Sequence, residues 1–484
     1  MANEAQAARP TGRSVQHLSI EERTKIGEEA RIRVPRSSQA EFSPGVDRPD
    51  PVALLERQAT TRVPELVPIR YGRMLVSPFT FFRGAALVMA SDLATTPRSG
   101  LKAQICGDAH LSNFGLFASP ERALRFDVSD FDETVPGPWE WDVKRLAASV
   151  VIAARDREFT AKEARTAALE VGASYRQQMA RLAGMTTLDV WYSSVDVASI
   201  LAELETGAGT TGSKADKRIA ERTTKMISKA RTRDHFQALG KLTTVIDGQL
   251  RIVSDPPLIV PVEELFPQLE SDALRESFHR LVSGYRRSLQ TDRRHLLEEF
   301  EFVQIARKVV GVGSVGTRTW ILLLVGRGND DPLFLQAKEA EASVLEEFVG
   351  KSGYANHAER VVAGQHLMQA ASDIFLGWQQ AEGPDGVNRD FYVRQLRDWK
   401  GSFEVERTFP PELTKYVGVC AQALARAHAR SGDRVAIASY LGSGPAFDGA
   451  IAEFAETYAD QNARDYEALK TAEASGRITV ESGL

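Results

Sequence analysis

The chain has 484 residues, and at roughly 150 residues per domain this length suits two or three packed units. Hydrophobic residues make up 43% and charged residues 26%, values that exclude collagen-like, low-complexity and largely disordered chains. The formal net charge of −5 gives no overall basic field, so we expect no nucleic-acid partner.

The cysteines and the N-terminus indicate a soluble protein of the cytoplasm. Cys106 and Cys420 are the two cysteines, and they are far apart in sequence, which favours a reducing compartment over a disulfide framework. The first residues contain no apolar segment typical of a secretory signal. The longest apolar runs, AALVMA and WILLLV, are much shorter than the about 20 residues that span a bilayer, so no membrane span is expected.

The first half of the chain is predicted to be mainly helical. Residues 1–60 are polar and indicate a loosely held arm with a short helix near 20–30. Apolar residues at three- and four-residue spacing then predict further helices, and short β-rich runs predict strands. The expected strands lie at 101–106 and 123–128, and the expected helices at 139–155, 160–183 and 272–299.

The middle of the chain contains a glycine-rich segment, a basic segment and a turn. Residues 207–213, GAGTTGS, indicate a flexible linker or hinge. The basic residues of 214–233 are typical of a solvated helix face, although a patch that attracts an anionic acceptor is the alternative. Residues 241–253 predict a hairpin that turns at Asp247 and Gly248.

The last third of the chain changes from β-rich to helical. Residues 302–337 alternate β-branched runs with polar turns and predict three strands. Helices at 358–372, 413–430 and 446–470 and a strand pair at 373–378 and 391–396 complete the prediction. Cys420 and His428 lie in an apolar-periodic helix, which favours a position in or near the core.

The segment Gly107-Asp108-Ala109-His110-Leu111-Ser112-Asn113 follows the strand expected at 101–106. An aspartate there can orient a nucleophilic hydroxyl and take its proton, while the asparagine carbonyl five residues later ligates magnesium. Asp130 follows another strand and can bridge such a metal to phosphate oxygens. The alternative is that these Asp and Asn residues only form turns, but the order and spacing of the two segments favour the metal site.

The second motif contains Gly311, Gly313, Ser314 and Gly316 between two β-rich runs. Glycines at this spacing let the backbone approach phosphates, either in a dinucleotide-binding turn or in a flap over ATP. A dinucleotide-binding turn needs a helix at the last glycine, whereas here the run RTWILLLV predicts a strand. The sequence therefore favours the ATP flap.

Lys338 ends the following strand and is predicted to reach the α- and β-phosphates. Such a lysine needs a carboxylate from a neighbouring helix to hold it. Glu359 is the favoured partner, and Glu346 and Glu347 are nearer alternatives. An ordinary surface lysine remains the competing interpretation. The later segment 391–402, FYVRQLRDWKGS, contains Arg394, Arg397, Asp398 and Lys400 and fits either an inter-lobe hinge or ordinary surface charges.

Together these segments resemble the aminoglycoside and choline kinase group of protein-kinase-like phosphotransferases, whose catalytic loop runs GDxHxxN and whose metal loop is of the IDFD type. The counterparts here are GDAHLSN and VSDFDET, followed by a helix that opens in GPWEWDVKRLA. The resemblance implies catalytic roles for Asp108 and His110, metal binding by Asn113, Asp130 and Asp132, and a bracing role for Asp142. The residue before GD is commonly His in that group and is Cys106 here.

From about residue 50 the chain also resembles a bacterial family, the domain of unknown function 2252 (DUF2252). The matching stretches are PFTFFRGAA, CGDAHLSNFG, FDVSDFDET, LQAKEA, RVVAGQHLMQAASD, YVRQLRDWKGS and ALARAHARSGD. This family has no settled activity, so the resemblance implies membership and no reaction.

The order of the motifs predicts an unusual chain connection. In ordinary kinases the glycine flap, lysine and helix glutamate come first, whereas here Asp108 and Asp130 precede Gly311 and Lys338. We therefore expect an α+β, protein-kinase-like two-lobed fold that is circularly permuted. The expected units are a polar arm (1–60), a helical lobe with the catalytic and metal loops (61–300), a β-rich nucleotide-binding lobe (301–402) and C-terminal helices that complete the helical lobe (403–484).

The expected function is ATP- and Mg²⁺-dependent phosphoryl transfer to an unidentified hydroxyl acceptor, either a small molecule or a protein. The alternative is a nucleotide-binding pseudokinase that regulates a partner, and adenylyl transfer or a metal-dependent phosphoesterase is less favoured. The sequence leaves the acceptor and the oligomeric state open.

Overall fold

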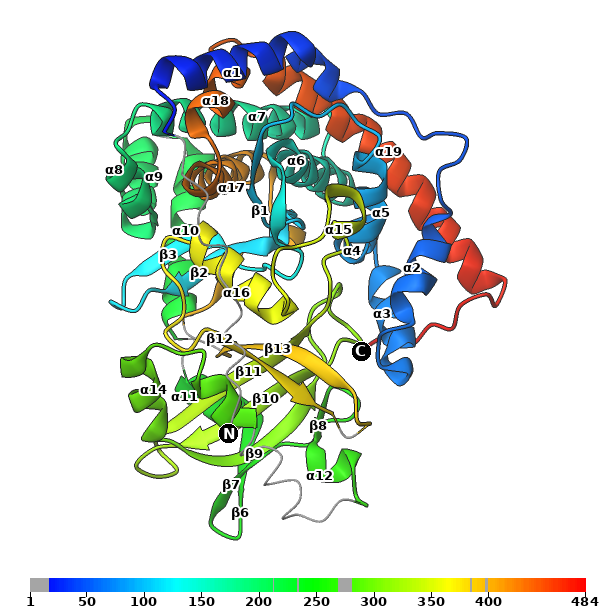
Figure 1. The fold of residues 1–484 in the computed structure, drawn as a ribbon, viewed down its shortest axis with the longest axis vertical. Helices are drawn as coiled ribbons and strands as arrows, with labels where there is room; N and C mark the ends of the chain where they lie inside the picture. The colour runs from blue at the N-terminus through cyan, green and yellow to red at the C-terminus, as the bar shows by residue number, and fades with distance from the viewer. Residues whose placement is uncertain (1–16, 212, 233–234, 269–280, 384, 397–398) are drawn as a thin grey trace, which may run out of the picture.

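The structure is a computed structural model that describes residues 17–211, 213–232, 235–268, 281–383, 385–396 and 399–484. It has the mixed α+β composition that the sequence predicts, and helices gather at one end and the main sheet at the other (Figure 1). The helices of the helical end are α1 (Ile20–Arg33), α4 (Pro78–Gly84), α5 (Ala86–Leu93), α6 (Trp139–Asp156), α7 (Ala161–Ala183), α8 (Thr187–Tyr192), α9 (Val197–Thr211), α10 (Lys214–Arg231), α17 (Pro410–Ser431), α18 (Arg434–Leu441) and α19 (Ala446–Ala474).

The core of the helical end is built from both ends of the chain. Helix α17 packs along α7 and α6, and α19 packs against α6 and α7. Trp139 stacks on Tyr175 with ring centroids 5.3 Å apart, which joins the start of α6 to α7. Two shorter helices, α2 (Pro51–Ala59) and α3 (Val67–Met74), lie beside the long α19 (Figure 1). Among the described residues, no helix is long and apolar enough to cross a membrane.

The main sheet is six-stranded and antiparallel throughout. Its order is β12 (Gly377–Glu382), β13 (Asn388–Gln395), β11 (Pro332–Ala340), β10 (Thr319–Val325), β9 (Glu301–Lys308) and β8 (Ile259–Pro261). Side chains alternate along β10, so that Leu322 and Leu324 join one apolar cluster while Ile321 and Leu323 join another on the opposite face.

Each face of the six-stranded sheet is covered. Helix α11 (His235–Leu242) and the hairpin of β6 (Thr243–Ile246) and β7 (Gln249–Ile252) pack on the face of Ile321. Tyr285, Leu289 and α14 (Thr291–Glu298) pack on the other face. The short α12 (Val262–Leu265) contacts β8 and β9 at this end. Helix α16 (His357–Met368) contacts β12 and β13 on one side and α17 on the other, and the short α15 (Glu346–Val349) contacts β4 (Val135–Pro138).

Two smaller sheets lie between the helices and the main sheet. One is four-stranded, in the order β14 (Gly401–Ser402), β2 (Phe114–Ala118), β3 (Leu124–Val128) and β5 (Val195–Asp196). The other pairs β1 (Lys102–Ile105) with β4 (Val135–Pro138). Except for Asp142, which lies on α6, the candidate site residues of the first half of the chain lie in the segments that connect these strands.

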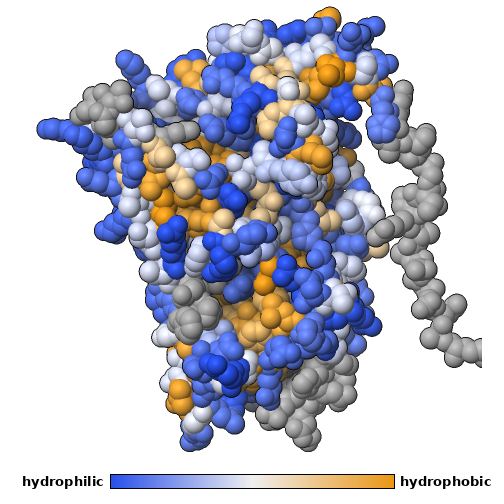
Figure 2. Space-filling view, turned by 90° about the vertical axis from the view of Figure 1, so that its left-hand side faces the viewer, coloured by the Kyte–Doolittle hydropathy of each residue, from blue (hydrophilic) through white to orange (hydrophobic). Residues whose placement is uncertain are grey.

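Several local predictions are confirmed. The 241–253 hairpin turns at Asp247 (φ 50°) and Gly248 (φ 76°), the pair of left-handed residues that a two-residue hairpin turn requires. Cys420 and His428 are fully buried in α17, as the apolar periodicity indicates. In Figure 2 hydrophilic residues cover most of the visible face, with apolar residues gathered in two areas.

Two local predictions are wrong. Residues 207–211 belong to α9 rather than to a hinge, because packing of α9 against α10 outweighs the low helix propensity of glycine. The helix expected at 272–299 is interrupted before α14, where Ser288 accepts a hydrogen bond from the Trp378 amide at 2.9 Å and anchors the start of β12. Residues 272–280 of that predicted helix lie outside the described residues, as do Arg233, Arg397 and Asp398.

Candidate active site

The loop after β1 is folded back on itself by backbone and side-chain hydrogen bonds. Gly107 has φ +81°, and a Cβ there would lie 2.6 Å from the Glu133 carbonyl oxygen, so the turn requires glycine. The Asp108 carbonyl accepts from the His110 amide at 2.8 Å and from Nδ2 of Asn113 at 2.6 Å. Because Nδ2 of Asn113 is engaged in this way, its Oδ1 is the atom that could ligate a cation.

Asp142 of α6 holds the start of this loop. Its carboxylate accepts from the amides of Cys106 at 2.8 Å and Gly107 at 2.9 Å. The third contact comes from His428 of α17, whose Nε2 lies 3.1 Å from Asp142 while its Nδ1 lies 2.8 Å from the Tyr175 hydroxyl. Burial raises the pKa of the Cys106 thiol well above its usual value, so the thiol is neutral beside this carboxylate. His428, in the last part of the chain, therefore helps to position the loop that contains Asp108 through Asp142.

Asp108 is paired with an arginine that the sequence did not single out. Nε of Arg145 donates to Oδ1 of Asp108 at 2.8 Å, and Nη2 donates to the Phe82 carbonyl at 2.7 Å. Burial raises the pKa of Asp108, and Arg145 opposes that rise. Arg145 lies one helical turn after Asp142 on α6, within the stretch GPWEWDVKRLA, so this spacing was the signal available in the sequence.

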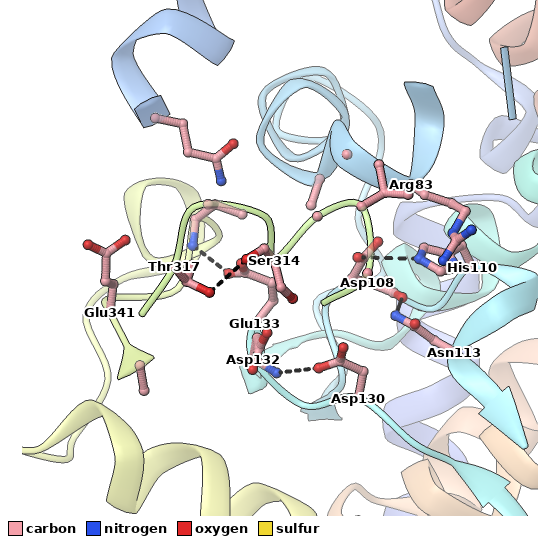
Figure 3. Close-up of a pocket in the computed structure, with 18 of the residues that line it drawn as sticks. Arg83, Asp108, His110, Asn113, Asp130, Asp132, Glu133, Ser314, Thr317 and Glu341 are labelled. Atoms are coloured by element: carbon pink, nitrogen blue, oxygen red, sulfur yellow. Dashed lines mark hydrogen bonds and ion pairs between the residues drawn. The ribbon is translucent and has the colours of Figure 1, made fainter. Parts of the chain in front are cut away.

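His110 lies beside Asp108, with Nε2 3.7 Å from Oδ2. Burial lowers the pKa of His110 well below its usual value, and Arg83 and Arg145 lower it further, so the imidazole is neutral. Arg83 lies in the last turn of α4 and lines the same cavity (Figure 3). Its position in the PFTFFRGAA stretch was the available sequence signal.

The loop after β3 presents two aspartates in different environments. The Asp132 amide donates to Oδ1 of Asp130 at 3.2 Å. Asp132 itself is ion-paired with Nζ of Lys338 and accepts from the Tyr392 hydroxyl at 2.8 Å. Burial raises the pKa of Asp130, but Lys338 and Arg394 outweigh it and hold that pKa below its usual value. Asp130 is therefore an anionic carboxylate that faces the cavity.

Lys338 has a different carboxylate partner from the one that the sequence favoured. It pairs with Asp132, and the described residues record no ion pair between Lys338 and Glu359. Glu359 lies on a partly exposed side of α16, where its amide donates to the Asn356 side chain at 2.9 Å. The alternatives are engaged elsewhere, Glu346 with Arg360 at 3.7 Å and Glu347 with Arg57 at 2.9 Å.

Helix α16 contributes a buried arginine to the site, Arg360, which directly follows Glu359. Its guanidinium donates to the carbonyls of Thr134 at 2.7 Å, Asp132 at 2.8 Å and Glu341 at 2.9 Å. Helical phase explains the difference, because residues 358 and 360 are buried while 359 is turned partly outward. Helix α16 thus supports the loop of Asp130 and Asp132 through an arginine.

The glycine segment forms a turn that the N-terminal part of the chain holds in place. Gly311 has φ +62° and Gly316 has φ +89°, conformations that favour glycine. Nη1 of Arg73 donates to the Gly311 carbonyl at 2.6 Å, and the Val63 amide donates to the Gly316 carbonyl at 2.8 Å. The segment leads into strand β10, which excludes the dinucleotide-binding turn that needs a helix there.

Two cavities meet at this turn. The first, of about 160 Å³, is lined by Asp108, His110, Asn113, Asp130, Asp132 and Glu133 together with Gly311, Gly313 and Ser314 (Figure 3). The second, of about 430 Å³, contains Lys338 and Arg394. Asp130, Gly311 and Ser314 line both cavities. Of the predicted site residues, Asp142 braces the loop from behind, while Gly316 and Glu359 line neither cavity.

The donor atoms at the junction fit a magnesium ion bound together with phosphates. No group of three His, Cys, Asp or Glu side chains that could hold a metal occurs among the described residues. Magnesium, however, is commonly held by one or two carboxylates and substrate phosphates. Asp130 and Oδ1 of Asn113 supply the hard oxygens, and Lys338 and the backbone of the glycine turn lie where phosphates would need positive charge and N–H donors.

Comparisons with known proteins give a family and no named activity. A family model described as "Uncharacterized protein conserved in bacteria (DUF2252)" matches residues 62–472, well over half of the chain. No curated protein and no solved structure matches the chain.

Proposed function

We propose that this chain, which belongs to the DUF2252 family, transfers the γ-phosphoryl group of ATP to a hydroxyl acceptor in a magnesium-dependent reaction. The observation that carries the proposal is the convergence of four separate segments on the two adjoining cavities. Asp108 and Asn113, Asp130, the glycine turn 311–316 and Lys338 all line them. These are the parts that phosphoryl transfer in kinases uses.

The chain connection supports a circularly permuted, protein-kinase-like fold. Along the chain, the glycine turn between β9 and β10, Lys338 on β11 and then α16 follow one another in the order of a kinase small lobe, and α17 then leads back into the helical end. The end of α17 lies against β1, where the Gln104 amide donates to Oγ of Ser431 at 3.0 Å. In an unpermuted kinase chain, the helix that corresponds to α17 would continue at this point into β1 and the loop of Asp108. The end of α17 and the start of β1 therefore lie together at the point where a permuted chain has to be cut.

In the proposed reaction the chain positions groups and neutralises charge. Lys338 and the N–H groups of the glycine turn bind phosphate oxygens, and Asp130 and Asn113 would hold magnesium, which supplies further neutralisation when bound. Oδ1 of Asp108 is occupied by Arg145, so Oδ2 is left to accept a hydrogen bond from the acceptor hydroxyl. The hydroxyl oxygen bonds to phosphorus as the bond to ADP breaks, and its proton passes to Asp108.

One observation favours the alternative, a pseudokinase that binds a nucleotide and regulates a partner. Arg145 pairs with Asp108, and Lys338 and Tyr392 occupy Asp132, so two of the acidic groups are already compensated within the chain. A regulatory protein needs such a preassembled site and no free base. Both functions require nucleotide binding, but only phosphoryl transfer requires turnover of ATP.

The test is the Asp108→Asn variant, incubated with magnesium and ATP, with water as the hydroxyl acceptor that takes the phosphoryl group, and followed by phosphorus NMR. We expect the formation of ADP to fall by at least about 100-fold, as for loss of a general base, while ATP affinity by calorimetry changes less than about threefold. Asp460→Asn, at an exposed pair with Arg155 on the surface, is the matched control and should retain the wild-type rate.

The outcomes separate the candidates. Unchanged ADP formation in Asp108→Asn would reject the assignment of Asp108. Nucleotide binding without any product from the wild-type chain would favour the pseudokinase, and AMP with pyrophosphate would indicate adenylyl transfer.

A further inference from the structure

The second cavity is strongly basic. Five basic side chains line it: Lys241, Lys308, Lys338, Arg394 and Lys400. Asp130 is the one acidic side chain among its described lining residues, and Asp132 compensates Lys338 from outside the lining. The basic residues come from α11, β9, β11, β13 and the segment before β14, so folding alone brings these charges together.

This cavity occupies the place where the base of a nucleotide would lie in the proposed fold, yet its walls are polar. Gln336 lies two residues before Lys338 on the same face of β11, and it is opposite Arg394 of β13 in the strand register. Val310 and Leu396 are the apolar side chains of the described lining. Sites for nucleobases and other small organic ligands are lined mainly by hydrophobic and aromatic side chains, so these walls fit a base poorly.

The apolar part of the same sheet face is already covered by the chain itself. Ala238 and Leu242 of α11 pack in one cluster with Ile321, Leu323 and Phe334 of the sheet. A planar base therefore has no apolar strip of sheet to lie on beside the cavity. The groups that remain accessible are the basic and amide side chains.

Arg394 shows how the cavity keeps its positive charge. Its guanidinium donates to two neutral groups, the Ser129 carbonyl at 3.2 Å and the Gln336 side chain at 3.4 Å. A guanidinium stays protonated at any ordinary pH, so Arg394 remains a cation. Like charges gathered in a partly enclosed space are stabilised when an anion binds among them.

We infer that the second cavity binds a chain of phosphate groups, with one end at the junction formed by Asp130 and the glycine turn and the other among Lys241, Lys308, Arg394 and Lys400. Its volume of about 430 Å³ lies within the range of small-ligand sites. The role of this ligand as phosphoryl donor rests on the proposed function, whereas its binding does not. Both inorganic polyphosphate and a nucleoside triphosphate whose base lies outside the cavity have this chemistry.

The test compares the binding of tripolyphosphate, ATP and adenosine by calorimetry in the presence of magnesium. We expect tripolyphosphate to bind at least as tightly as ATP and adenosine to show no binding, with an affinity for tripolyphosphate that falls as salt rises. The double variant Lys241→Gln/Lys308→Gln should weaken tripolyphosphate at least about 30-fold, since each lysine offers a charge-assisted hydrogen bond.

The control is Lys25→Gln/Lys470→Gln, which removes the same charge from exposed sites on α1 and α19. Equal weakening in both double variants, or adenosine that binds as tightly as ATP, would overturn the inference. Tight ATP binding with weak tripolyphosphate binding would also contradict it. If tripolyphosphate binds as expected but neither it nor ATP supports transfer, the proposed function fails and the inference stands.

Discussion

Two groups of aspartates near the site have different surroundings. Asp127 and Asp142, which we call the floor, are buried and paired within the fold, whereas Asp108 and Asp130, the cavity face, line the first cavity. On the floor, the Asp127 side chain is 1% exposed, its two oxygens lie 2.7 and 2.6 Å from Nη2 of Arg426, and it also accepts from the Ala370 amide at 3.0 Å. Asp142 is satisfied in the same manner, partly by His428. Asp130 instead faces a cavity and has its charge stabilised by nearby lysine and arginine.

The difference comes from one helix. Arg426 and His428 both belong to α17, in the last part of the chain. They contact Asp127 and Asp142, which lie in the first third of the chain. Aspartates that α17 contacts are fixed structural parts. Asp108, by contrast, pairs with Arg145 of α6, the charge of Asp130 is stabilised by nearby Lys338 and Arg394, and both aspartates line the cavity. Stability and ligand binding should therefore respond differently to changes in the two regions.

The largest expected effect is on the floor. Arg426→Leu leaves the buried Asp127 carboxylate without its cation, and loss of one partner of a buried pair costs about 3–5 kcal/mol of the free energy of unfolding. Urea denaturation followed by circular dichroism measures this change. Arg155→Leu removes the arginine of an exposed pair with Asp460 and should cost less than about 1 kcal/mol. Similar losses in the two variants would show that α17 does not hold the floor through this pair.

A smaller effect, dependent on pH, is expected at the edge of the cavity. Burial raises the pKa of Glu133 from 4.5 to about 7, against the opposing influence of Arg360. Between pH 4.5 and 7 the folded chain keeps a proton that the unfolded chain has released. Glu133 therefore stabilises the folded state below pH 4.5, and this stability is lost as pH rises to 7, by about 3 kcal/mol.

Glu133→Gln tests this dependence, because its neutral amide can still accept the hydrogen bond that the Val344 amide donates at 2.7 Å. The variant should match the wild type near pH 4.5 and be more stable by about 3 kcal/mol at pH 8. Unfolding curves at the two pH values provide the measurement. An equal stability difference at both would mean that the pKa of Glu133 is not raised in the folded chain.

The sequence predicted the segments of the site better than the contacts between them. Asp108, Asn113 and Asp130 could be identified because loop motifs keep fixed spacing, and the hairpin at Asp247 because its turn needs left-handed residues. The partner of Lys338 could not, because the exposure of Glu359 depends on how α16 is rotated against the sheet. Arg145 and Arg83 lie in stretches that the sequence did single out, but their roles could not be predicted, because pairing with Asp108 and lining the cavity depend on tertiary packing.

The basic cavity was equally invisible in the sequence. Lys241 and Lys308 are separated by the β6–β7 hairpin and the segment that follows it, and Lys400 lies beyond β13. The sequence did indicate a basic segment, 214–233. Its described part lines neither cavity, and Arg222 and Lys229 in it pair with Glu412 and Glu404. The run of basic residues in the sequence thus marked the surface of α10 and not the basic cavity.

The smallest loss of unfolding free energy is expected for a change at Tyr392 on β13, which contacts Asp132 beside the cavity face. Its hydroxyl donates to Oδ1 of Asp132 at 2.8 Å, while Lys338 pairs with Oδ2. Tyr392→Phe removes one hydrogen bond to a charged group that keeps its cation, so the free energy of unfolding should fall by about 1–2 kcal/mol. Tyr354→Phe, at an exposed tyrosine, is the matched control and should cost nothing measurable in the same urea titration. A loss as large as that of Arg426→Leu would mean that Asp132 behaves as a floor aspartate. No loss would mean that Lys338 alone fixes it, and Asp132 would then belong fully to the cavity face.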